Sequence, residues 1–260
     1  MKVIRQGSTG AAVRSWQYFL LGQGLYPYKA DGSFGPRTHE ATVTFQQKHG
    51  LLPADGVVGN RTMGQAMLLG YAMLIDTEKG QPGPNWPDRP PFEPLVGNDA
   101  RAQVFGKFRF KSAPVPGNPE NILVEDGWEA KNIVWIDIPQ LARINNGRTK
   151  VRFHKLAARQ FQGLWAAWEE AGLVDRAVSW QGSYVPRFIR GSRTTLSNHA
   201  FGTAFDINSI WNGLGVCPPV VGQEGCVREL VSIAHHFGFY WGGHFPNRAD
   251  GMHFEVAVVK

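Results

Sequence analysis

A nine-residue segment that occurs twice, 24 positions apart, constrains the fold of the first seventy residues more than any other feature. Ala30-Asp31-Gly32-Ser33-Phe34-Gly35-Pro36-Arg37-Thr38 is followed by Ala54-Asp55-Gly56-Val57-Val58-Gly59-Asn60-Arg61-Thr62. In both copies the Asp-Gly pair predicts a tight turn, and the second Gly lets the chain reverse before a helix. Thr38 and Thr62 are the predicted N-caps of the helices that follow.

Apolar residues with helical spacing precede the first copy and lie between the copies: Val13, Trp16, Leu20, Leu21, Ala41, Val43, Phe45 and Leu51. This pattern predicts a three-helix unit with two matching turn–helix elements. The unit resembles the small peptidoglycan-binding module found at the ends of many cell-wall hydrolases. The matching positions are Gly7, Gly10, Val13, Trp16, Gln17, Leu20, Asp31, Gly32, Phe34, Gly35, Thr38, Phe45, Gln46, Asp55, Gly56, Gly59 and Thr62. The resemblance implies that a groove between the repeats binds glycan or stem peptide.

A proline-rich stretch divides the chain. Five prolines lie between residues 82 and 93, which predicts an extended linker. We therefore expect a peptidoglycan-binding module over residues 1–72, a linker over 73–98 and a second domain over 99–260. No apolar run approaches the roughly 20 residues of a membrane span.

The second domain is predicted to mix helices and strands, which makes it an α+β domain with a small antiparallel sheet. Strand-like segments occur at 104–110, 131–138, 204–207 and 254–259, and helical segments at 153–170 and 227–237. The apolar stripe predicted for the 153–170 helix consists of Leu156, Phe161, Leu164, Trp165 and Trp168.

Two short segments of this domain carry residues suited to chemistry. Ser197 to Asp206 places an imidazole, His199, and a carboxylate, Asp206, seven positions apart with Gly202 and Ala204 between them. The small residues allow the backbone to fold back so that His199 and Asp206 meet at one ion. A second imidazole, His253, completes three corners of a zinc tetrahedron and leaves the fourth for water.

Asp250 is expected to act on the bound water rather than on the metal, because it precedes His253 on a Gly-containing turn. Zinc lowers the pKa of a bound water to about 7, so a carboxylate of modest basicity can accept its proton and pass it on to the departing amine. Met252, Phe254 and Val256 alternate with His253 and Glu255, which predicts a strand with one apolar face. Glu255 is expected to line the cleft rather than to hold the His253 ring.

These residues resemble the zinc D-alanyl-D-alanine carboxypeptidase and L-alanyl-D-glutamate endopeptidase family. The resemblance rests on Ser197 to Asp206, on Trp241-Gly242-Gly243, and on Asp250 to Glu255. It implies His199, Asp206 and His253 as zinc ligands and Asp250 as the catalytic acid and base. One departure is His244, which stands where an Asp is usual.

Three further residues are expected to act on the substrate. Arg187 ends a Gln181-to-Arg187 segment that takes the place of a Gly-Tyr-Arg-like segment in the family. A fixed cationic fork suits a substrate carboxylate or a developing oxyanion, so Arg187 is a catalytic candidate. Ser197 and Gln181 are predicted substrate contacts. Cys217 and Cys226 are close enough in sequence to form a local disulfide, but two reduced thiols are favoured.

The net charge of +6 favours an anionic partner, but the 27 Lys and Arg residues are scattered and form no nucleic-acid motif. We therefore expect a monomeric zinc hydrolase of peptidoglycan with no nucleic-acid partner and no stable membrane association. An L-alanyl-D-glutamate endopeptidase is favoured. A D,D-carboxypeptidase, a D-Ala–diaminopimelate endopeptidase and a non-catalytic wall-binding protein are the alternatives.

Residues Met1 to Gly7 lack the pattern of a signal peptide. The expectation for location is accordingly synthesis in a host cytoplasm and action on the wall after release, as a phage endolysin or a virion component.

Overall fold

The computed structural model describes residues 3–69, 71, 86–221 and 223–260. They form two compact units. One contains the described residues up to Trp86 together with Pro219–Arg228, and the other contains Pro87–Pro218 and Glu229–Lys260. Residues 73–85 of the predicted linker lie outside the described residues. None of the described helices is both long and apolar enough to span a bilayer.

The N-terminal unit is built from α1 (Ala11–Gly22), α2 (Pro36–Lys48) and α3 (Asn60–Leu68), which confirms the predicted three-helix module. Aromatic side chains hold the helices together. The Trp16 ring of α1 lies 5.3 Å from Phe19 of the same helix and 5.5 Å from Phe45 of α2. Tyr71 packs against both Trp16 and Phe19. The predicted apolar positions of α1 are all buried.

The prediction that Thr38 and Thr62 cap helices is wrong. Gly35 and Gly59 occupy the N-cap positions, and each threonine is buried in the first turn of its helix. There the hydroxyl of Thr38 accepts a hydrogen bond from the Gln17 amide, 3.0 Å away, and that of Thr62 accepts one from Gln46 at the same distance. The threonines therefore tie each turn to the preceding helix.

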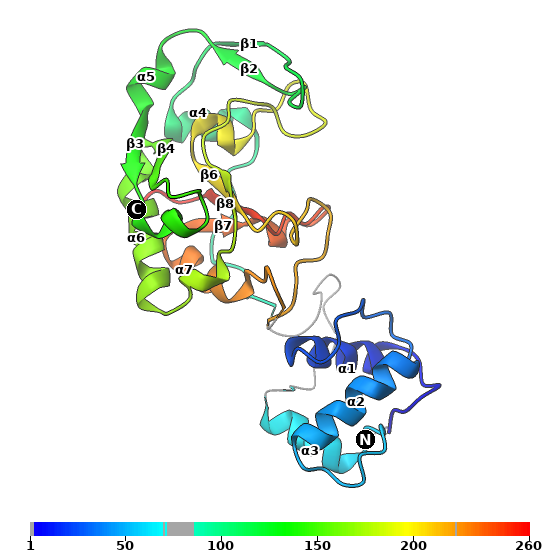
Figure 1. Ribbon diagram of the computed structural model, residues 1–260. Coiled ribbons are helices and arrows are strands. Elements are labelled where there is room, and N and C mark those ends of the chain that lie inside the picture. The colour runs from blue at the N-terminus through cyan, green and yellow to red at the C-terminus, as the bar shows by residue number, and fades with distance from the viewer. Residues whose placement is uncertain (1–2, 70, 72–85, 222) are drawn as a thin grey trace. The chain divides into compact units, whose positions relative to one another are not determined.

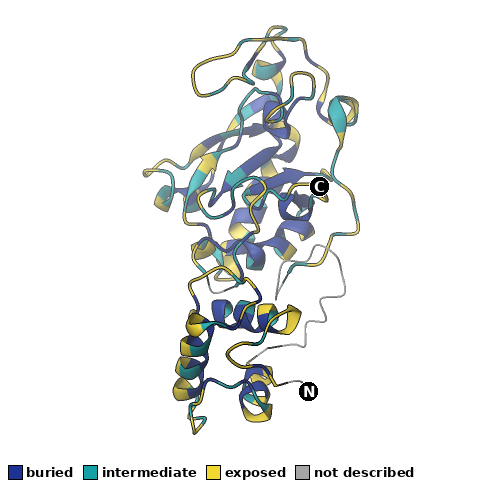
Figure 2. Cartoon of the chain, turned by 90° about the vertical axis from the view of Figure 1, so that its right-hand side faces the viewer, coloured by how far each residue is buried: buried dark blue, intermediate teal, exposed yellow. Residues whose placement is uncertain are grey.

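The second unit is centred on a four-stranded antiparallel sheet in the order β5 (Trp180–Gly182), β6 (Ala204–Ile207), β8 (His253–Val256), β7 (Phe239–Trp241). Helix α6 (Ala158–Glu170) covers one face of the sheet. Phe161 of α6 lies 4.8 Å from Phe205, and Phe205 stacks on Phe254 of the neighbouring strand at 5.3 Å. Figure 2 shows the buried residues gathered on these strands and on the inner sides of the helices. This confirms the predicted α+β class.

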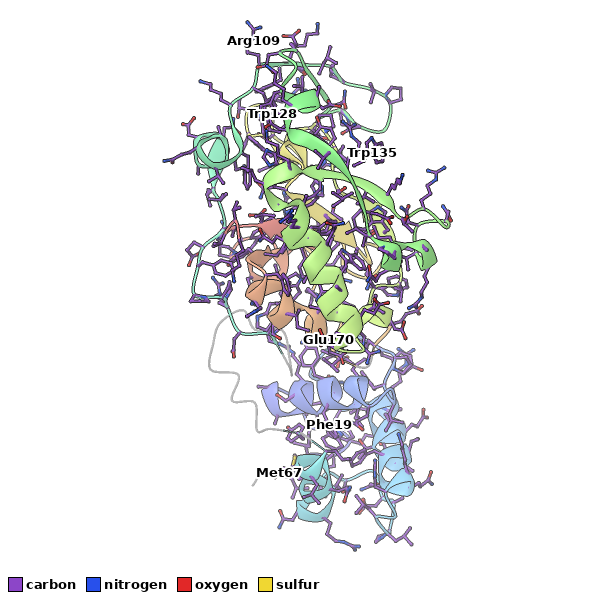
Figure 3. The ribbon with its side chains drawn as sticks, turned by 90° about the vertical axis from the view of Figure 1, so that its left-hand side faces the viewer. Phe19, Met67, Arg109, Trp128, Trp135 and Glu170 are labelled. Carbon is purple, nitrogen blue, oxygen red and sulfur yellow. The ribbon has the colours of Figure 1, made fainter. Side chains whose placement is uncertain are left out.

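Smaller elements surround this core. Strands β1 (Phe110–Ser112) and β2 (Ile122–Val124) form one antiparallel pair, and β3 (Ile133–Asp137) and β4 (Lys150–His154) form another. The remaining helices are α4 (Gly97–Phe105), α5 (Trp128–Asn132) and α7 (Arg228–His236). The β1–β2 pair lies at the end of this unit opposite α7 (Figure 1). Figure 3 shows where α6 ends, at Glu170, and Trp135 on the exposed side of β3.

Two predicted segments differ from the structure. The 104–110 strand is wrong, because α4 continues to Phe105 and Gly106, at φ 89°, ends it. Phe105 and Phe108 are buried from this helix end and the following loop, so their apolar character reflects core packing rather than strand alternation. The helix predicted from residue 153 begins only at Ala158, and Leu156 is 48% exposed.

Candidate active site

Three elements bring His199, Asp206 and His253 together. His199 lies on a 3-10 helix, Asn198–Phe201, while Asp206 on β6 is the direct cross-strand partner of His253 on β8. Asp206 Oδ1 lies 2.9 Å from His253 Nδ1 and 3.1 Å from His199 Nε2, and the two imidazole nitrogens are 3.2 Å apart. These are the side chains assigned as ligands from the sequence, and the structure gathers them on the sheet face opposite α6.

The His199 ring is oriented by its other nitrogen. Nδ1 lies 2.7 Å from the carbonyl oxygen of Ser183, so Nδ1 donates there and the lone pair of Nε2 faces Asp206. The backbone around the ring depends on Gly202, at φ 66°, where an added Cβ would lie 2.6 Å from Ile133 Cδ1. Ser197 Oγ accepts a hydrogen bond from the His199 N–H at 3.3 Å, which makes it a cap of this short helix.

His253 is held in the same way by a carboxylate. Its Nε2 lies 3.0 Å from Oε2 of Glu255, a buried residue. The expectation that Glu255 only lines the cleft is therefore wrong. Residues two apart on a strand share a face, and this shared face is what allows the contact. Burial lowers the pKa of His253, but its bonds to Asp206 and Glu255 outweigh that effect and raise the pKa to about 10.

The donor set fits a zinc ion. The N–H groups of both imidazoles point away from the cluster, toward Ser183 O and Glu255. His199 Nε2, His253 Nδ1 and Asp206 Oδ1 then face one another within 3.2 Å, and three electron-rich atoms at such distances require a cation between them. Two imidazoles and one carboxylate, about 2 Å from a shared ion, form a common zinc set with one open position. Among the described residues, these three form the one cluster of potential metal ligands.

Asp250 lies beside the cluster on a turn held by the Trp241-Gly242-Gly243 segment. The Trp241 indole donates to the Gly251 carbonyl at 2.8 Å, and Asp250 N donates to Gly242 O at 2.9 Å. A Cβ at Gly242 would lie 2.5 Å from Asp250 O and 3.1 Å from His253 Cβ, so only glycine allows this approach. The Oδ1 atom of Asp250 is buried and, among the described residues, has no hydrogen-bond partner. Burial raises the pKa of this carboxyl.

These groups open into a cavity of about 820 Å³. It is lined by every residue predicted for the site, namely Gln181, Arg187, Ser197, His199, Asp206, Asp250 and His253. Arg187 Nη1 donates to Phe188 O at 3.1 Å, and burial lowers the pKa of its guanidinium. The Gln181 amide is engaged with Ser179 and with the Ser209 N–H.

Arg101 on α4 is a lining residue that was not predicted from the sequence. It is only 6% exposed, donates from Nη1 to Leu196 O at 2.8 Å, and feels the negative charge of Glu255. Its Nε has no partner among the described residues. Arg101 lies about 100 positions before the Ser197 motif and about 150 before the Asp250 motif, and no local pattern marks it, so only the three-dimensional packing reveals it.

His244, the departure from the family pattern, contacts the segment that precedes α4. Its Nε2 lies 2.8 Å from the Pro87 carbonyl oxygen, and its own carbonyl accepts a hydrogen bond from Arg89 at 3.0 Å. The side chain thus secures the segment that leads into α4. Cys217 is exposed and Cys226 is buried.

Comparisons with known families match both units. Residues 190–256 match the family model described as D-alanyl-D-alanine carboxypeptidase, and residues 9–65 match the model described as "Putative peptidoglycan binding domain". The first match includes all three clustered side chains and Asp250. The second includes both copies of the internal repeat.

Individual relatives align with about a quarter of the chain. Two spore cortex-lytic enzymes of Bacillus cereus are 43% identical over 61 residues, which is 24% of this chain and 23% of theirs. The chain thus spans less than a quarter of the length of these curated relatives. Among solved structures, the SleB N-terminal domain is 38% identical over 26% of this chain and 92% of that chain, with a TM-score of 0.25. A fused Zn-dependent amidase/peptidase/peptidoglycan-binding protein from Clostridium acetobutylicum is 43% identical over 25% of this chain and 28% of that chain, with a TM-score of 0.24.

Proposed function

Because the chain joins an N-terminal peptidoglycan-binding domain to a D-alanyl-D-alanine carboxypeptidase-like domain, we propose that it is a zinc peptidase that hydrolyses peptidoglycan stem peptides. The observation that carries the proposal is the meeting of His199, Asp206 and His253 in one cavity that Asp250 also lines. A structural zinc site closes around four protein ligands. Among the described residues this cluster offers three, and the Asp250 Oδ1 atom in the same cavity has no hydrogen-bond partner there.

Zinc bound to the three side chains would polarise the scissile carbonyl and make water more acidic. Asp250 would take the proton from the attacking water, because its Oδ1 has no competing donor among the residues that the structure describes and burial raises the pKa of its carboxyl. The same proton then passes to the departing amine, so that the peptide bond yields a carboxylate and an amine. Arg187 holds a substrate carboxylate or the developing oxyanion with a cation that lines the cavity.

The favoured bond is L-alanyl-D-glutamate, as the Asp250-to-His253 spacing resembles that of the endopeptidase branch. The matched family model is described by D,D-carboxypeptidase activity, and this makes that activity the second candidate. Ser197 and Gln181 line the cavity and are proposed substrate contacts. We further propose that the protein is a monomer that acts as a phage endolysin or a virion component. Its wall-binding part would span residues 1–72, the linker 73–98 and the peptidase 99–260.

Mass spectrometry of digested muropeptides tests the proposal. An L-alanyl-D-glutamate endopeptidase creates peptides with a new N-terminal D-glutamate, whereas a D,D-carboxypeptidase releases free D-alanine. A chelator should abolish either reaction and Zn²⁺ should restore it. Hydrolysis that persists in the metal-stripped protein would overturn the zinc mechanism. Muropeptides left unchanged and no D-alanine released by the zinc-loaded protein would favour a non-catalytic wall-binding protein instead.

A further inference from the structure

The internal repeat builds two equivalent cavities on the N-terminal unit. One, of about 420 Å³, is lined by Asp31, Gly35, Arg37 and Thr38 among others. The second, of about 220 Å³, is lined by the residues 24 positions later, Asp55, Gly59, Arg61 and Thr62. The chain therefore supplies two versions of one site, and their differences show which version suits a ligand.

The inner parts of the two cavities are the same. Asp31 Oδ1 accepts hydrogen bonds from Ser33 N at 2.8 Å and from the Gln17 amide at 2.9 Å. Asp55 Oδ1 accepts the corresponding bonds from Val57 N at 2.9 Å and from the Gln46 amide at 3.0 Å. These bonds lower the pKa of both carboxyl groups and hold them in the turn. The shared part of each cavity is accordingly structural.

The arginines differ. The guanidinium carbon of Arg37 lies 4.3 Å from the ring centroid of Tyr28, and that ring is 43% exposed. Tyr28 in turn packs edge-on against the buried Tyr26 at 5.4 Å. Stacking on an aromatic face holds a guanidinium while leaving its N–H groups available. Within the described parts of the chain, Arg37 has no carboxylate partner.

In the second cavity Arg61 is already engaged. Its Nη1 donates to the Leu52 carbonyl at 2.8 Å, and Leu52 and Pro53 stand at the positions that Tyr28 and Lys29 occupy in the first cavity. The charges differ as well. Lys29, Arg37 and Asp31 line the first cavity, and their formal charges sum to +1, whereas Arg61 and Asp55 in the second sum to zero. Only the first cavity thus offers an unpaired, pre-oriented cation.

We propose that the Tyr28–Arg37 cavity is the subsite through which the module binds a carboxylate of the peptidoglycan stem peptide. Its repeat-related counterpart at Arg61 has a structural role. A guanidinium fork pairs with a carboxylate in a planar, two-bond geometry, and the neighbouring Lys29 adds attraction for an anion. This inference rests on the proposed wall-binding function and assigns it to one of the two cavities.

Co-sedimentation of the zinc-loaded full chain with purified sacculi on ice, in brief incubations, tests the assignment. Replacing Arg37→Gln should weaken binding about tenfold, the usual cost of losing one charged hydrogen-bond pair. The matched control Arg61→Gln should stay within about twofold of the unaltered chain, since its cation faces its own backbone. Tyr28→Ala should weaken binding about threefold, and Tyr28→Phe should retain it because the ring still supports the guanidinium.

Chemical treatment of the sacculi identifies the ligand. Coupling the stem-peptide carboxylates to methylamine should weaken binding of the unaltered chain about tenfold and leave the Arg37→Gln variant unchanged. Removing wall phosphate polymers with cold acid should change neither. Loss of binding on phosphate removal alone would show a phosphate ligand and overturn the carboxylate assignment.

Two outcomes distinguish a failure of this inference from a failure of the proposed wall-binding function. If the unaltered chain does not sediment with sacculi, the wall-binding function itself fails. If it sediments and Arg61→Gln weakens binding as much as Arg37→Gln, wall binding stands and the assignment to the Tyr28–Arg37 cavity is wrong. Thermal unfolding of each variant, with both arginines exposed in the native structure, excludes a folding defect as the cause.

Discussion

His253 and Glu255 are hydrogen-bonded on one face of β8, with His253 Nε2 3.0 Å from Glu255 Oε2. This bond places the N–H of the imidazole on the side of Glu255 and leaves Nδ1 to face Asp206. The carboxylate is thus a positioning group for the ring rather than a ligand. The finding also shows that two of the three clustered side chains are oriented by protein acceptors, Glu255 for His253 and the Ser183 carbonyl for His199.

Glu255→Gln should weaken zinc binding by about 10- to 100-fold, because the neutral amide holds the imidazole N–H less strongly. A competition titration with a chromophoric chelator measures this directly, independent of catalysis. Glu170→Gln, at the exposed end of α6, is the control and should leave the zinc affinity unchanged. Equal affinities for the Glu255 variant and the unaltered protein would remove the positioning role.

Asp250→Asn and Asp206→Asn should separate catalysis from metal binding. The first variant should retain zinc and lose about 10²- to 10⁴-fold in kcat, the usual contribution of a positioned general base. The second should lose both, because it removes a negatively charged atom that faces both imidazoles. Metal content by mass spectrometry and muropeptide turnover are measured on the same samples. A fully active Asp250→Asn protein would falsify the assignment of the proton acceptor.

Gly242→Ala should inactivate the enzyme, because the new Cβ would lie 2.5 Å from Asp250 O and displace the turn that carries Asp250 and His253. Gly213→Ala is the matched control, since a Cβ there meets Val216 at an ordinary 3.5 Å. Turnover and zinc affinity of the two variants are compared. Normal activity of the Gly242 variant would mean that the close packing is not required.

Gln46→Ala should destabilise the N-terminal unit by about 1–3 kcal/mol, because it leaves buried groups of the Asp55–Thr62 turn without their partners. Its neighbour Gln47 is exposed on the same helix, and Gln47→Ala should change stability by no more than about 0.5 kcal/mol. Hydrogen exchange across residues 36–68 of the full chain reports the difference. Similar exchange rates in the two variants would contradict the network's role.

His154 predicts a loss of stability in acid. Burial lowers its pKa from 6.5 to about 4, and its Nδ1 accepts a hydrogen bond from Leu156 N that protonation would break. Because the folded-state pKa lies below the unfolded value, the stabilisation is present above pH 6.5 and declines as the pH falls toward 4. Urea unfolding of metal-stripped protein at pH 7.5 and pH 5 should therefore show a larger loss for the unaltered chain than for His154→Gln. Equal losses would assign the acid sensitivity to other groups.

The parts of the fold that the sequence predicted are those where local pattern and tertiary packing agree. The segment 204–207 is a strand because its alternate residues Phe205 and Ile207 pack into the core, and α1 is helical because its apolar stripe meets Phe45. The segment 104–110 failed because Phe105 and Phe108 enter the core from a helix end and a loop, which alternation cannot distinguish from a strand.

In the candidate site, too, the residues in local sequence motifs were predicted and those that depend on tertiary contacts were not. His199, Asp206, Asp250 and His253 lie in short motifs whose glycines and spacing are visible in the chain, and the structure brings them into one cavity. Arg101 and the Ser183 carbonyl were missed because their roles arise from contacts between distant segments. Glu255 was considered from the sequence, but only its contact with His253 in the structure shows that it holds the ring rather than merely lining the cleft.

The pairing of β6 with β8 places Asp206 opposite His253 and Phe205 opposite Phe254. Side chains alternate between the faces of a sheet, so a slip of one residue would exchange the two sets. The imidazole would then enter the aromatic layer beneath α6, and a phenyl ring would take its place beside His199. The aromatic stacking of Phe205 and Phe254 thus selects the strand alignment in which Asp206 and His253 meet. The β6–β8 register therefore determines both the packing of the aromatic core and the assembly of the candidate site.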